Sequence, residues 1–308
     1  MSSLAILFTA LQFFTGTIST TQQQVLSLFN VFNPETPANF AKNLNSIIGP
    51  VRNPNAADLT LDAKAGLILD LDSNKVMYAK NSDDRLPIAS ITKIMTALVV
   101  LDKYGDKLDT VVTIPPEAIS VTGSRMNLQA GEQITVRNLL QGMLIDSAND
   151  AATAFAYIVS GTPAKFVPLM NSKAQTLKLF NTHFTNPVGF DDAQHYSTVT
   201  DLAELTRSAV TNAFFAQTVA TKNLTVKDKS GTIIHKLVNT NKLLGQFVNV
   251  TGVKTGTTTE AGESLVAEAV GSAKQRVVIV LLDSPDRFGE GEKGLNWALT
   301  SYTWIEPV

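Results

Sequence analysis

Three short polar motifs in this chain of 308 residues together contain the parts of a serine acyl-transfer site. Each pattern occurs once, in this order: Ser90-x-x-Lys93, Ser147-x-Asn149 and Lys254-Thr255-Gly256. A serine hydroxyl is a weak nucleophile at neutral pH and needs a base within hydrogen-bonding reach. Residues three apart on a helix share a face, so Lys93 can reach Ser90. An isolated pair of this kind would usually be an ordinary surface lysine beside a helical serine, so the interpretation depends on all three motifs.

A lysine can act as a base only when it is neutral, whereas an exposed ammonium group has a pKa of about 10.4. Burial and a nearby positive charge both lower the pKa of a lysine. We therefore expect Lys93 to be buried, with Lys254 as the neighbouring cation. The N-terminus of the helix that carries Ser90 would offer the Ser90 N–H to a developing oxyanion.

The Ser147-x-Asn149 motif stands at a predicted break between two helical stretches. A loop there can point both side chains into a cleft, where the Ser147 hydroxyl passes a proton to a leaving amine. The Asn149 amide can donate to a substrate carbonyl while its oxygen holds Lys93. Taken alone, the motif would rather cap the helix that starts near Asp150, and the two interpretations are compatible.

The Lys254-Thr255-Gly256 motif is predicted to end an edge strand. Gly256 would allow close approach of a substrate backbone, Thr255 offers a hydroxyl, and Lys254 supplies positive potential for an anionic group. Thr257 would follow on the strand, and its N–H is a candidate second oxyanion donor. On its own such a motif is usually a turn, so its meaning depends on the other two.

The composition excludes several other classes of protein. With 44% hydrophobic and 17% charged residues, the chain suits one large globular domain or two intimate subdomains. A net charge of −2 gives no basic surface for nucleic acid. There are no cysteines, which excludes disulfides and thiol catalysis. The histidines His183, His195 and His235 lack metal-ligand spacing, so we expect structural or surface roles for them.

The N-terminal segment has the character of a signal peptide or membrane anchor, which we assign to residues 1–24. An apolar run from Leu4 to Ile18 precedes a polar stretch, although the first basic residue is Lys42. The run is shorter than the ~20 residues that span a bilayer, and a buried N-terminal helix of a cytosolic protein is the alternative. Residues 25–57 contain four prolines and are predicted to be a tether, so the folded domain would cover residues 58–308.

Apolar periodicity divides the rest of the chain into strands, then helices, then strands, then a closing helix. A hairpin is expected over residues 65–71 and 75–79, and the Ser90 helix ends before Gly105. The further helices are predicted at 136–145 with a Thr135 cap, 150–158, 163–178 and 200–210, the strands at 232–234, 248–253, 264–267 and 276–282, and the closing helix at 295–304. This order predicts an α+β fold with a helical subdomain at about 112–225 and the motifs at its junction with the sheet.

Over residues 60–304 the chain resembles the D-alanyl-D-alanine carboxypeptidases, which are low-molecular-weight penicillin-binding proteins of the S11 peptidase type. The three motifs match the family signature. Further similar stretches are Gly123–Met126 with Ala130–Glu132, Asn186–Gly189 with His195–Thr198, Asn239–Asn241 with Leu243–Leu244, and Glu260–Gly262. The resemblance implies a β-lactamase/DD-peptidase-like α+β fold. In that fold an antiparallel sheet is flanked by helices, with an all-helical subdomain and the active site at the junction.

The resemblance also implies roles for individual residues. Ser90 would be the acyl-ester nucleophile and Lys93 the proton acceptor, with Ser147 and Asn149 as the second catalytic element. Lys254 and Thr255 would contact substrate, and Arg287 falls where family members carry an arginine that helps hold the terminal carboxylate. The placement of Arg287 depends on how the loop from Ser284 to Gly291 aligns.

The implied activity is removal of the terminal D-alanine from peptidoglycan stem peptides, with penicillin as a covalent inhibitor. No metal, organic cofactor or nucleic-acid partner is expected, and the implied location is extracytoplasmic. Relatives often continue into a β-rich domain and an amphipathic helix, whereas this sequence stops at Val308, so any membrane attachment is expected through the N-terminus. A Glu-x-x-Leu-Asn element typical of class A β-lactamases is absent between Ser147 and Lys254, which favours slow turnover of penicillin. The alternatives are a DD-endopeptidase, a β-lactamase and a non-catalytic peptidoglycan-binding protein.

Overall fold

The computed structural model describes residues 49–246 and 249–305, which belong to one compact unit beginning at Gly49. The predicted signal peptide or anchor over residues 1–24, and the larger part of the predicted tether, lie outside the described residues. Within residues 49–246 and 249–305, no helix is both long and apolar enough to cross a membrane.

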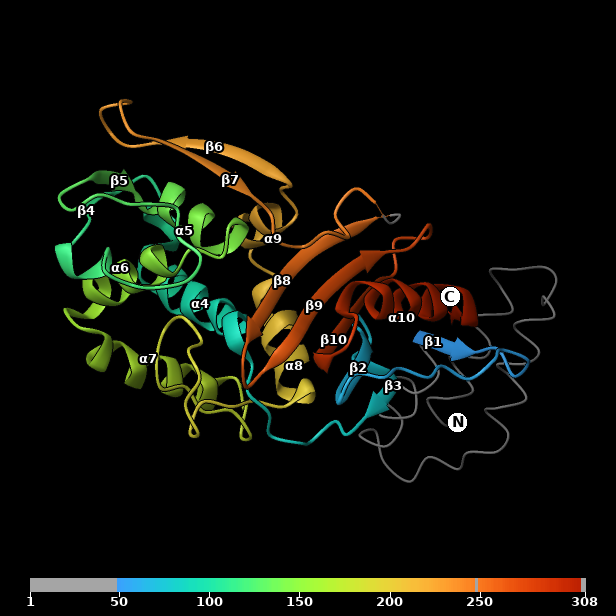
Figure 1. Cartoon of the computed structure of the whole chain (residues 1–308). Helices are drawn as coiled ribbons and strands as arrows, with labels where there is room; N and C mark the ends of the chain where they lie inside the picture. The colour runs from blue at the N-terminus through green and yellow to red at the C-terminus, as the bar shows by residue number, and fades with distance from the viewer. Residues whose placement is uncertain (1–48, 247–248, 306–308) are drawn as a thin grey trace, which may run out of the picture. The chain divides into compact units, whose positions relative to one another are not determined.

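The centre of the unit is a five-stranded antiparallel sheet (Figure 1). In spatial order its strands are β3 (Lys75–Lys80), β2 (Ala65–Asp70), β10 (Arg276–Ser284), β9 (Gly262–Val270) and β8 (Val250–Thr258). All six residues of β2 are buried, as are Val277 to Leu282 of β10. A strand that is covered on both faces has a continuous run of apolar residues, and both strands could therefore be predicted from the sequence. The predicted hairpin of β2 and β3 is confirmed.

The helices between β3 and β8 gather beside the sheet (Figure 1). They are α4 (Lys93–Tyr104), α5 (Val136–Ile145), α6 (Asn149–Ser160), α7 (Pro163–Thr176), α8 (Val199–Ala209) and α9 (Ala213–Val219), with 3-10 turns at η1 (Ala89–Thr92), η2 (Gly105–Lys107) and η3 (Pro116–Ala118). Every residue of α4 from Lys93 to Leu101 is buried, and α4 contacts α5, α6, α7 and α8. The helix that leads away from Ser90 is therefore the core of the helical subdomain.

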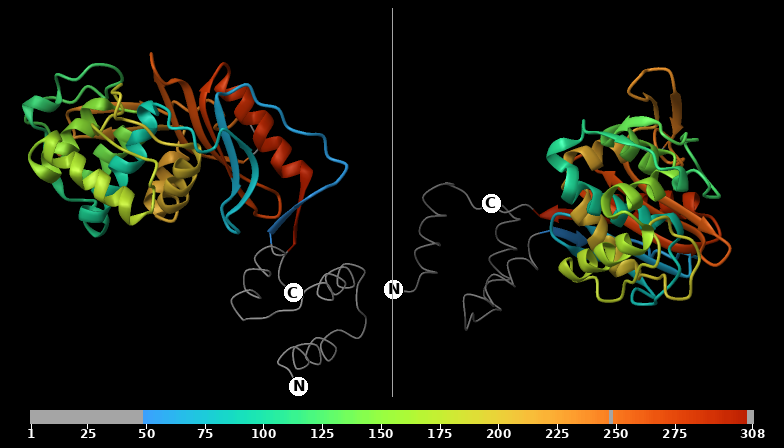
Figure 2. Two further views of the ribbon diagram at one scale, coloured as in Figure 1. Left: turned by 90° about the horizontal axis from the view of Figure 1, so that it is seen from below. Right: turned by 90° about the vertical axis from the view of Figure 1, so that its left-hand side faces the viewer.

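Helices cover both faces of the sheet. Neighbouring residues of a strand point to opposite faces, and on β2 Ile68 shares a hydrophobic cluster with Leu295, whereas Leu67 shares another with Leu202. Leu202 lies on α8, and Leu295 lies on α10 (Arg287–Ser301). Figure 2 shows α10 on the side of the sheet away from the helical subdomain. The predicted α+β fold is confirmed.

The sequence analysis expected an all-helical subdomain, but the structure shows that this subdomain also contains strands. It carries two small sheets of paired strands, β4 (Val111–Thr113) with β5 (Gln133–Thr135) and β6 (Asn223–Lys227) with β7 (Ile234–Val238). These strands have three or five residues each; β4 and β5 come from separate stretches of chain, whereas β6 and β7 form a hairpin. Such short runs leave only a weak periodic signal in a sequence.

The last helix and the start of the domain also differ from expectation. Helix α10 begins at Arg287, well before the predicted Leu295, because the Asp286 carboxylate caps it by accepting the Gly289 N–H. Its glycine-rich first turns hide the apolar period. The helix is followed by β11 (Tyr302–Ile305), which pairs with β1 (Gly49–Arg52). The described fold therefore includes Gly49 to Arg52, before the predicted start at Asp58, because strand β1 depends on a partner at the other end of the described chain.

Candidate active site

Ser90 lies in η1, the 3-10 turn that leads into α4, where the helical subdomain meets the edge strand β8. Strand β8 packs tightly against this turn at Gly256. A methyl group on Gly256 would lie 2.9 Å from the Ile88 oxygen and 3.1 Å from the Ser90 nitrogen. Gly256 is thus required for contact between β8 and the nucleophile turn, whereas the sequence analysis explained it by the approach of substrate.

Lys93 is fully buried directly beside Ser90. Its Nζ lies 2.7 Å from the Ser90 Oγ and donates to the Val188 carbonyl at 2.9 Å. Burial holds the pKa of Lys93 well below its usual range, the charge of Lys254 lowers it further, and Asp150 acts in the opposite direction. Burial and the charge of Lys254 thus both favour the neutral amine that a general base requires.

Ser147 and Asn149 stand at the break between α5 and α6, as predicted. Ser147 has a positive φ of 57°, and its Oγ accepts a hydrogen bond of 2.8 Å from Lys254 Nζ. The side chain of Asn149 donates to the Thr122 carbonyl at 2.7 Å. The N-cap of α6 is Ala148, without a side-chain cap, so the capping alternative is wrong.

The expected contact between the Asn149 oxygen and Lys93 is not among the hydrogen bonds of residues 49–246 and 249–305. Lys93 instead uses the backbone carbonyl of Val188. The sequence analysis missed this segment as part of the site. The signal was present in Asn186-Pro187-Val188-Gly189, because the Asn186 side-chain oxygen accepts the N–H groups of residues 188–190 and shapes the turn that presents this carbonyl.

Lys254 lies within β8 rather than at its end, since the strand continues to Thr258. Burial, followed by the charge of Arg287, lowers the pKa of Lys254 to about 7, and Asp146 opposes the shift. Thr255 is also buried, and its hydroxyl donates to the Thr240 hydroxyl at 2.7 Å. The edge position predicted for this strand is confirmed.

Arg287 lies at the first turn of α10, and the fold brings it to the same strand. Its guanidinium donates to the Gly256 carbonyl at 2.8 Å and to the hydroxyl of the exposed Thr257. Among the residues that the structure describes, its buried Nε has no hydrogen-bond partner, and a Glu263 carboxylate oxygen lies 3.7 Å from it. Eight of the nine residues singled out in the sequence are therefore connected through η1, the first residue of α4, the α5–α6 break, β8 and the start of α10. The ninth, Asn149, follows Ser147 by two residues, and its side chain contacts the Thr122 carbonyl.

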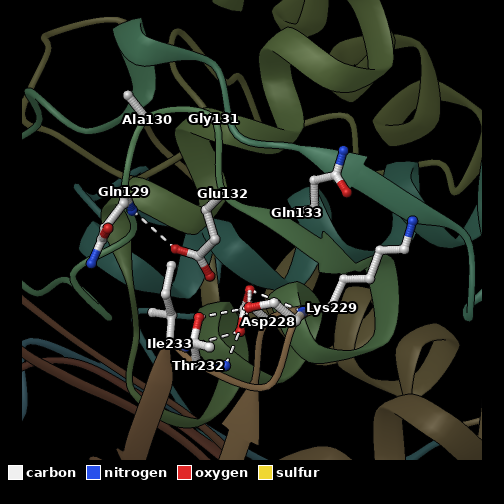
Figure 3. A pocket seen from close by; sticks show the side chains of 10 residues that line it. Gln129, Ala130, Gly131, Glu132, Gln133, Asp228, Lys229, Thr232 and Ile233 are labelled. Carbon is white, nitrogen blue, oxygen red and sulfur yellow. Dashed lines mark hydrogen bonds between the residues drawn. The ribbon is translucent and has the colours of Figure 1, made fainter.

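A cavity of about 580 Å³ elsewhere contains none of these nine residues (Figure 3). It lies between residues 129–133 and the tip of the β6–β7 hairpin, and its acidic groups already have partners. The Glu132 carboxylate contacts the His235 ring at 2.8 Å and accepts the Gln129 N–H, while Asp228 accepts from the backbone and hydroxyl of Ser230. The cavity therefore offers no comparable set of reactive groups.

The chain is similar to known enzymes over most of its length. It is 36% identical over 251 residues to "D-alanyl-D-alanine carboxypeptidase DacF" of Bacillus subtilis, covering 80% of this chain and 64% of that protein. It is 35% identical over 262 residues to "D-alanyl-D-alanine carboxypeptidase DacC" of Escherichia coli, covering 81% of this chain and 64% of that protein. The chain thus spans just under two thirds of the length of these relatives.

The crystal structure of the Streptomyces K15 DD-transpeptidase matches this structure with a TM-score of 0.74 at 33% identity. The match covers 79% of this chain and 99% of that one. A sequence model described as D-alanyl-D-alanine carboxypeptidase, Peptidase_S11, matches residues 52–286, which contain all of the nine residues singled out in the sequence except Arg287. The chain therefore belongs to the D-alanyl-D-alanine carboxypeptidase family of S11 peptidases.

Proposed function

We propose that this protein is a serine D-alanyl-D-alanine carboxypeptidase that removes the terminal D-alanine from peptidoglycan stem peptides. The observation that carries the proposal is the 2.7 Å contact between the fully buried Lys93 amine and the Ser90 hydroxyl. A neutral amine at that distance can take the hydroxyl proton as the Ser90 oxygen attacks the carbonyl carbon. Family membership supports the same chemistry.

In the first half of the reaction an ester bond to Ser90 forms and the peptide bond to D-alanine breaks. The leaving amine needs a proton, which the Ser147 hydroxyl can supply while it is hydrogen-bonded to Lys254. Water then attacks the ester and releases the shortened peptide. Lys93 returns its proton to the Ser90 oxygen, and the proton that water loses restores the hydrogen-bonded pair of Ser147 and Lys254. The N–H groups of Ser90 and Thr257 are assigned to the oxyanion, and the Asn149 amide to a substrate carbonyl.

The terminal carboxylate of the substrate is assigned to the wall formed by Lys254, Thr255, Gly256, Thr257 and Arg287. Support comes from the Arg287 guanidinium, which contacts strand β8 at the Gly256 carbonyl, and from the neighbouring hydroxyl of Thr257, which is exposed. A guanidinium group matches the planar geometry of a carboxylate. β-Lactam antibiotics would acylate Ser90 through the same contacts and act as covalent inhibitors.

The location proposed for this activity is outside the cytoplasm, in cell-wall synthesis. Its basis is the apolar run before residue 24, which would act as an export signal or as an N-terminal membrane attachment. Within the same site, a DD-endopeptidase is a variant of the reaction that differs only in the leaving amine. A second candidate is a DD-transpeptidase, in which an amine replaces water as acceptor. The structural match over 99% of the K15 enzyme favours this candidate.

The test is to incubate the purified protein and Ser90→Ala with a fluorescent penicillin and to measure intact masses. We expect one adduct on the wild type and none on the variant, and an unlabelled wild type would exclude the acyl-enzyme proposal and leave a non-catalytic binding protein. Release of D-alanine from a pentapeptide, cleavage of a crosslinked dimer, or transfer to an added amine then distinguishes the three reactions. Rapid recovery of free enzyme after penicillin treatment would instead indicate a β-lactamase.

A further inference from the structure

His195 is a buried histidine that the proposed reaction does not use. Only 3% of its surface is exposed, and it lies between the nucleophile turn η1 and the segment from Thr185 to Phe190. Phe184 packs edge-on against the imidazole with ring centroids 5.7 Å apart, which fixes the plane of the ring. Both ring nitrogens have hydrogen-bond partners.

The directions of these hydrogen bonds follow from the donor at one end. The Thr185 N–H can only donate, so Nδ1 of His195 accepts at 3.1 Å. In a neutral imidazole the other nitrogen then carries the proton, and Nε2 donates to the Thr92 hydroxyl at 2.7 Å. Thr92 in turn donates to the Ala89 carbonyl at 2.7 Å. Burial lowers the pKa of His195 to about 4, which keeps the ring neutral.

Ala89, where this chain of hydrogen bonds ends, has an unusual backbone. It adopts a positive φ of 46° and directly precedes Ser90. A residue with a side chain persists in this left-handed region only when its surroundings hold it there. Gly189 presses on the same carbonyl, since a methyl group at Gly189 would lie 1.8 Å from the Ala89 oxygen. The orientation of the Ala89 peptide therefore sets the position of the Ser90 backbone and the direction of its side chain.

We propose that His195 is a positioning residue for the nucleophile, acting through Thr92 on the Ala89 peptide. It would keep the Ser90 Oγ and N–H aligned with the Lys93 amine and the substrate carbonyl. The same histidine holds the Thr185 backbone, and the segment that follows supplies the Val188 carbonyl to Lys93. His195 thus joins the two backbone stretches that flank the Ser90–Lys93 pair.

The proposal rests on the proposed function, and its test compares two amide replacements. The nitrogen of a glutamine can reach the position of Nε2, so His195→Gln keeps a donor to Thr92. The oxygen of an asparagine reaches only the position of Nδ1, so His195→Asn keeps the acceptor for Thr185 and loses that donor. In stopped-flow acylation with a fluorescent penicillin, we expect His195→Asn to lower the limiting acylation rate by about 10- to 100-fold with little change in the concentration for half-saturation. His195→Gln should restore most of the rate.

Thr92 supplies a second, independent pair of variants. Thr92→Val removes the linking hydroxyl and should slow acylation like His195→Asn, whereas Thr92→Ser should retain the rate. The double variant His195→Asn/Thr92→Val should be no slower than the slower single variant, because both break one connection. If circular dichroism shows that His195→Asn does not fold, the comparison of Thr92→Val with Thr92→Ser tests the proposal by itself.

His183 provides a matched control, because within the described residues its ring makes one hydrogen bond, from Nδ1 to the Gln194 carbonyl, and none to η1. We expect His183→Gln to acylate at the wild-type rate. Equal rates for His195→Asn, Thr92→Val and the wild type would overturn the positioning role and leave the proposed function intact. A wild-type protein that takes no penicillin would overturn the proposed function, and the positioning role with it.

Discussion

Lys93 and Lys254 are buried lysines whose amines reach Ser90 and Ser147, respectively. The charge of Lys254 is the second cause of the lowered pKa of Lys93, after burial. Arg287 acts in the same way on Lys254. The row of Lys93, Lys254 and Arg287 continues from the nucleophile to the proposed carboxylate wall, so the positive charge proposed to attract the substrate carboxylate also favours the neutral form of Lys93.

The first prediction concerns Lys93→Met, which replaces the amine with an apolar side chain of similar length. We expect the rate of acylation by penicillin to fall at least about 100-fold, because the general base is lost. The pKa of Lys93 is lower in the folded state than in the unfolded state, so below about pH 10.4 the unfolded chain binds more protons at this group. The buried amine therefore destabilises the fold at pH 7. The variant should therefore unfold at the same or a higher temperature than the wild type at pH 7. Wild-type acylation would contradict the role of Lys93.

The second prediction concerns His195 and acid stability. Its folded pKa is about 4, below the usual 6.5, so as the pH falls through 6.5 the unfolded chain takes up a proton before the native state does. The free energy of unfolding should therefore decrease by about 3 kcal/mol between about pH 6.5 and pH 4 through this group. Urea denaturation of the wild type and His195→Gln checks this, with a smaller decrease expected for the variant. Parallel curves would show that His195 does not contribute.

At the scale of elements, two neighbouring segments hold the turn η1 in place. Gly256 of β8 contacts it from one side, and Gly189 contacts the Ala89 carbonyl. Glycine at both places lets backbone lie against backbone. The precision of the Ser90–Lys93 pair therefore depends on strands and loops that are distant in the sequence.

The third prediction compares Gly189→Ala with Gly161→Ala. Both glycines have a positive φ, 93° and 84°, but a methyl group at Gly161 would meet no atom within 4 Å. Gly161→Ala should cost only the left-handed backbone penalty of about 1–2 kcal/mol and leave acylation unchanged. Gly189→Ala must also displace the Ala89 carbonyl, so we expect a larger loss of stability and at least about tenfold slower acylation. Equal effects of the two changes in thermal unfolding and acylation would contradict this contact.

At the scale of the whole molecule, the two ends of the described chain meet. Strand β1 pairs with β11, the Arg52 guanidinium lies 5.5 Å from the centre of the Trp297 ring, and the Trp297 indole donates to the Ala57 carbonyl. The pairing closes the domain beside α10 and extends it before Asp58. Residues predicted as the end of a flexible tether therefore contribute to stability.

The fourth prediction compares a chain that starts at Asp58 with one that starts at Gly49. Four cross-strand pairs are lost in the shorter chain, and at about 0.5 kcal/mol each this lowers the free energy of unfolding by about 2 kcal/mol. A decrease in Tm of roughly 4–8 °C is expected by calorimetry. The hydrogen bonds of β1 reach β11 and not the site, so penicillin acylation should be unchanged. Equal Tm values would show that β1 adds nothing.

Most of the sheet and the principal helices could be predicted from the sequence, because buried strands and amphipathic helices carry their own apolar patterns. The Thr135 cap of α5 is an example, since the threonine accepts the Asn138 N–H as expected. Strands β1 and β11 and the early start of α10 could not be predicted. Their stability comes from partners far along the chain or from a cap without an apolar period.

For the site, the sequence by itself determined the reactive groups, because hydroxyls, amines and amides at these spacings suit one kind of chemistry. Only the tertiary structure decided their environment. It buries Lys93, connects Lys254 to Ser147, brings Arg287 to Gly256, and supplies the Val188 carbonyl. Burial, pKa and backbone contacts arise from segments that are adjacent only after folding, and a linear pattern does not contain that information.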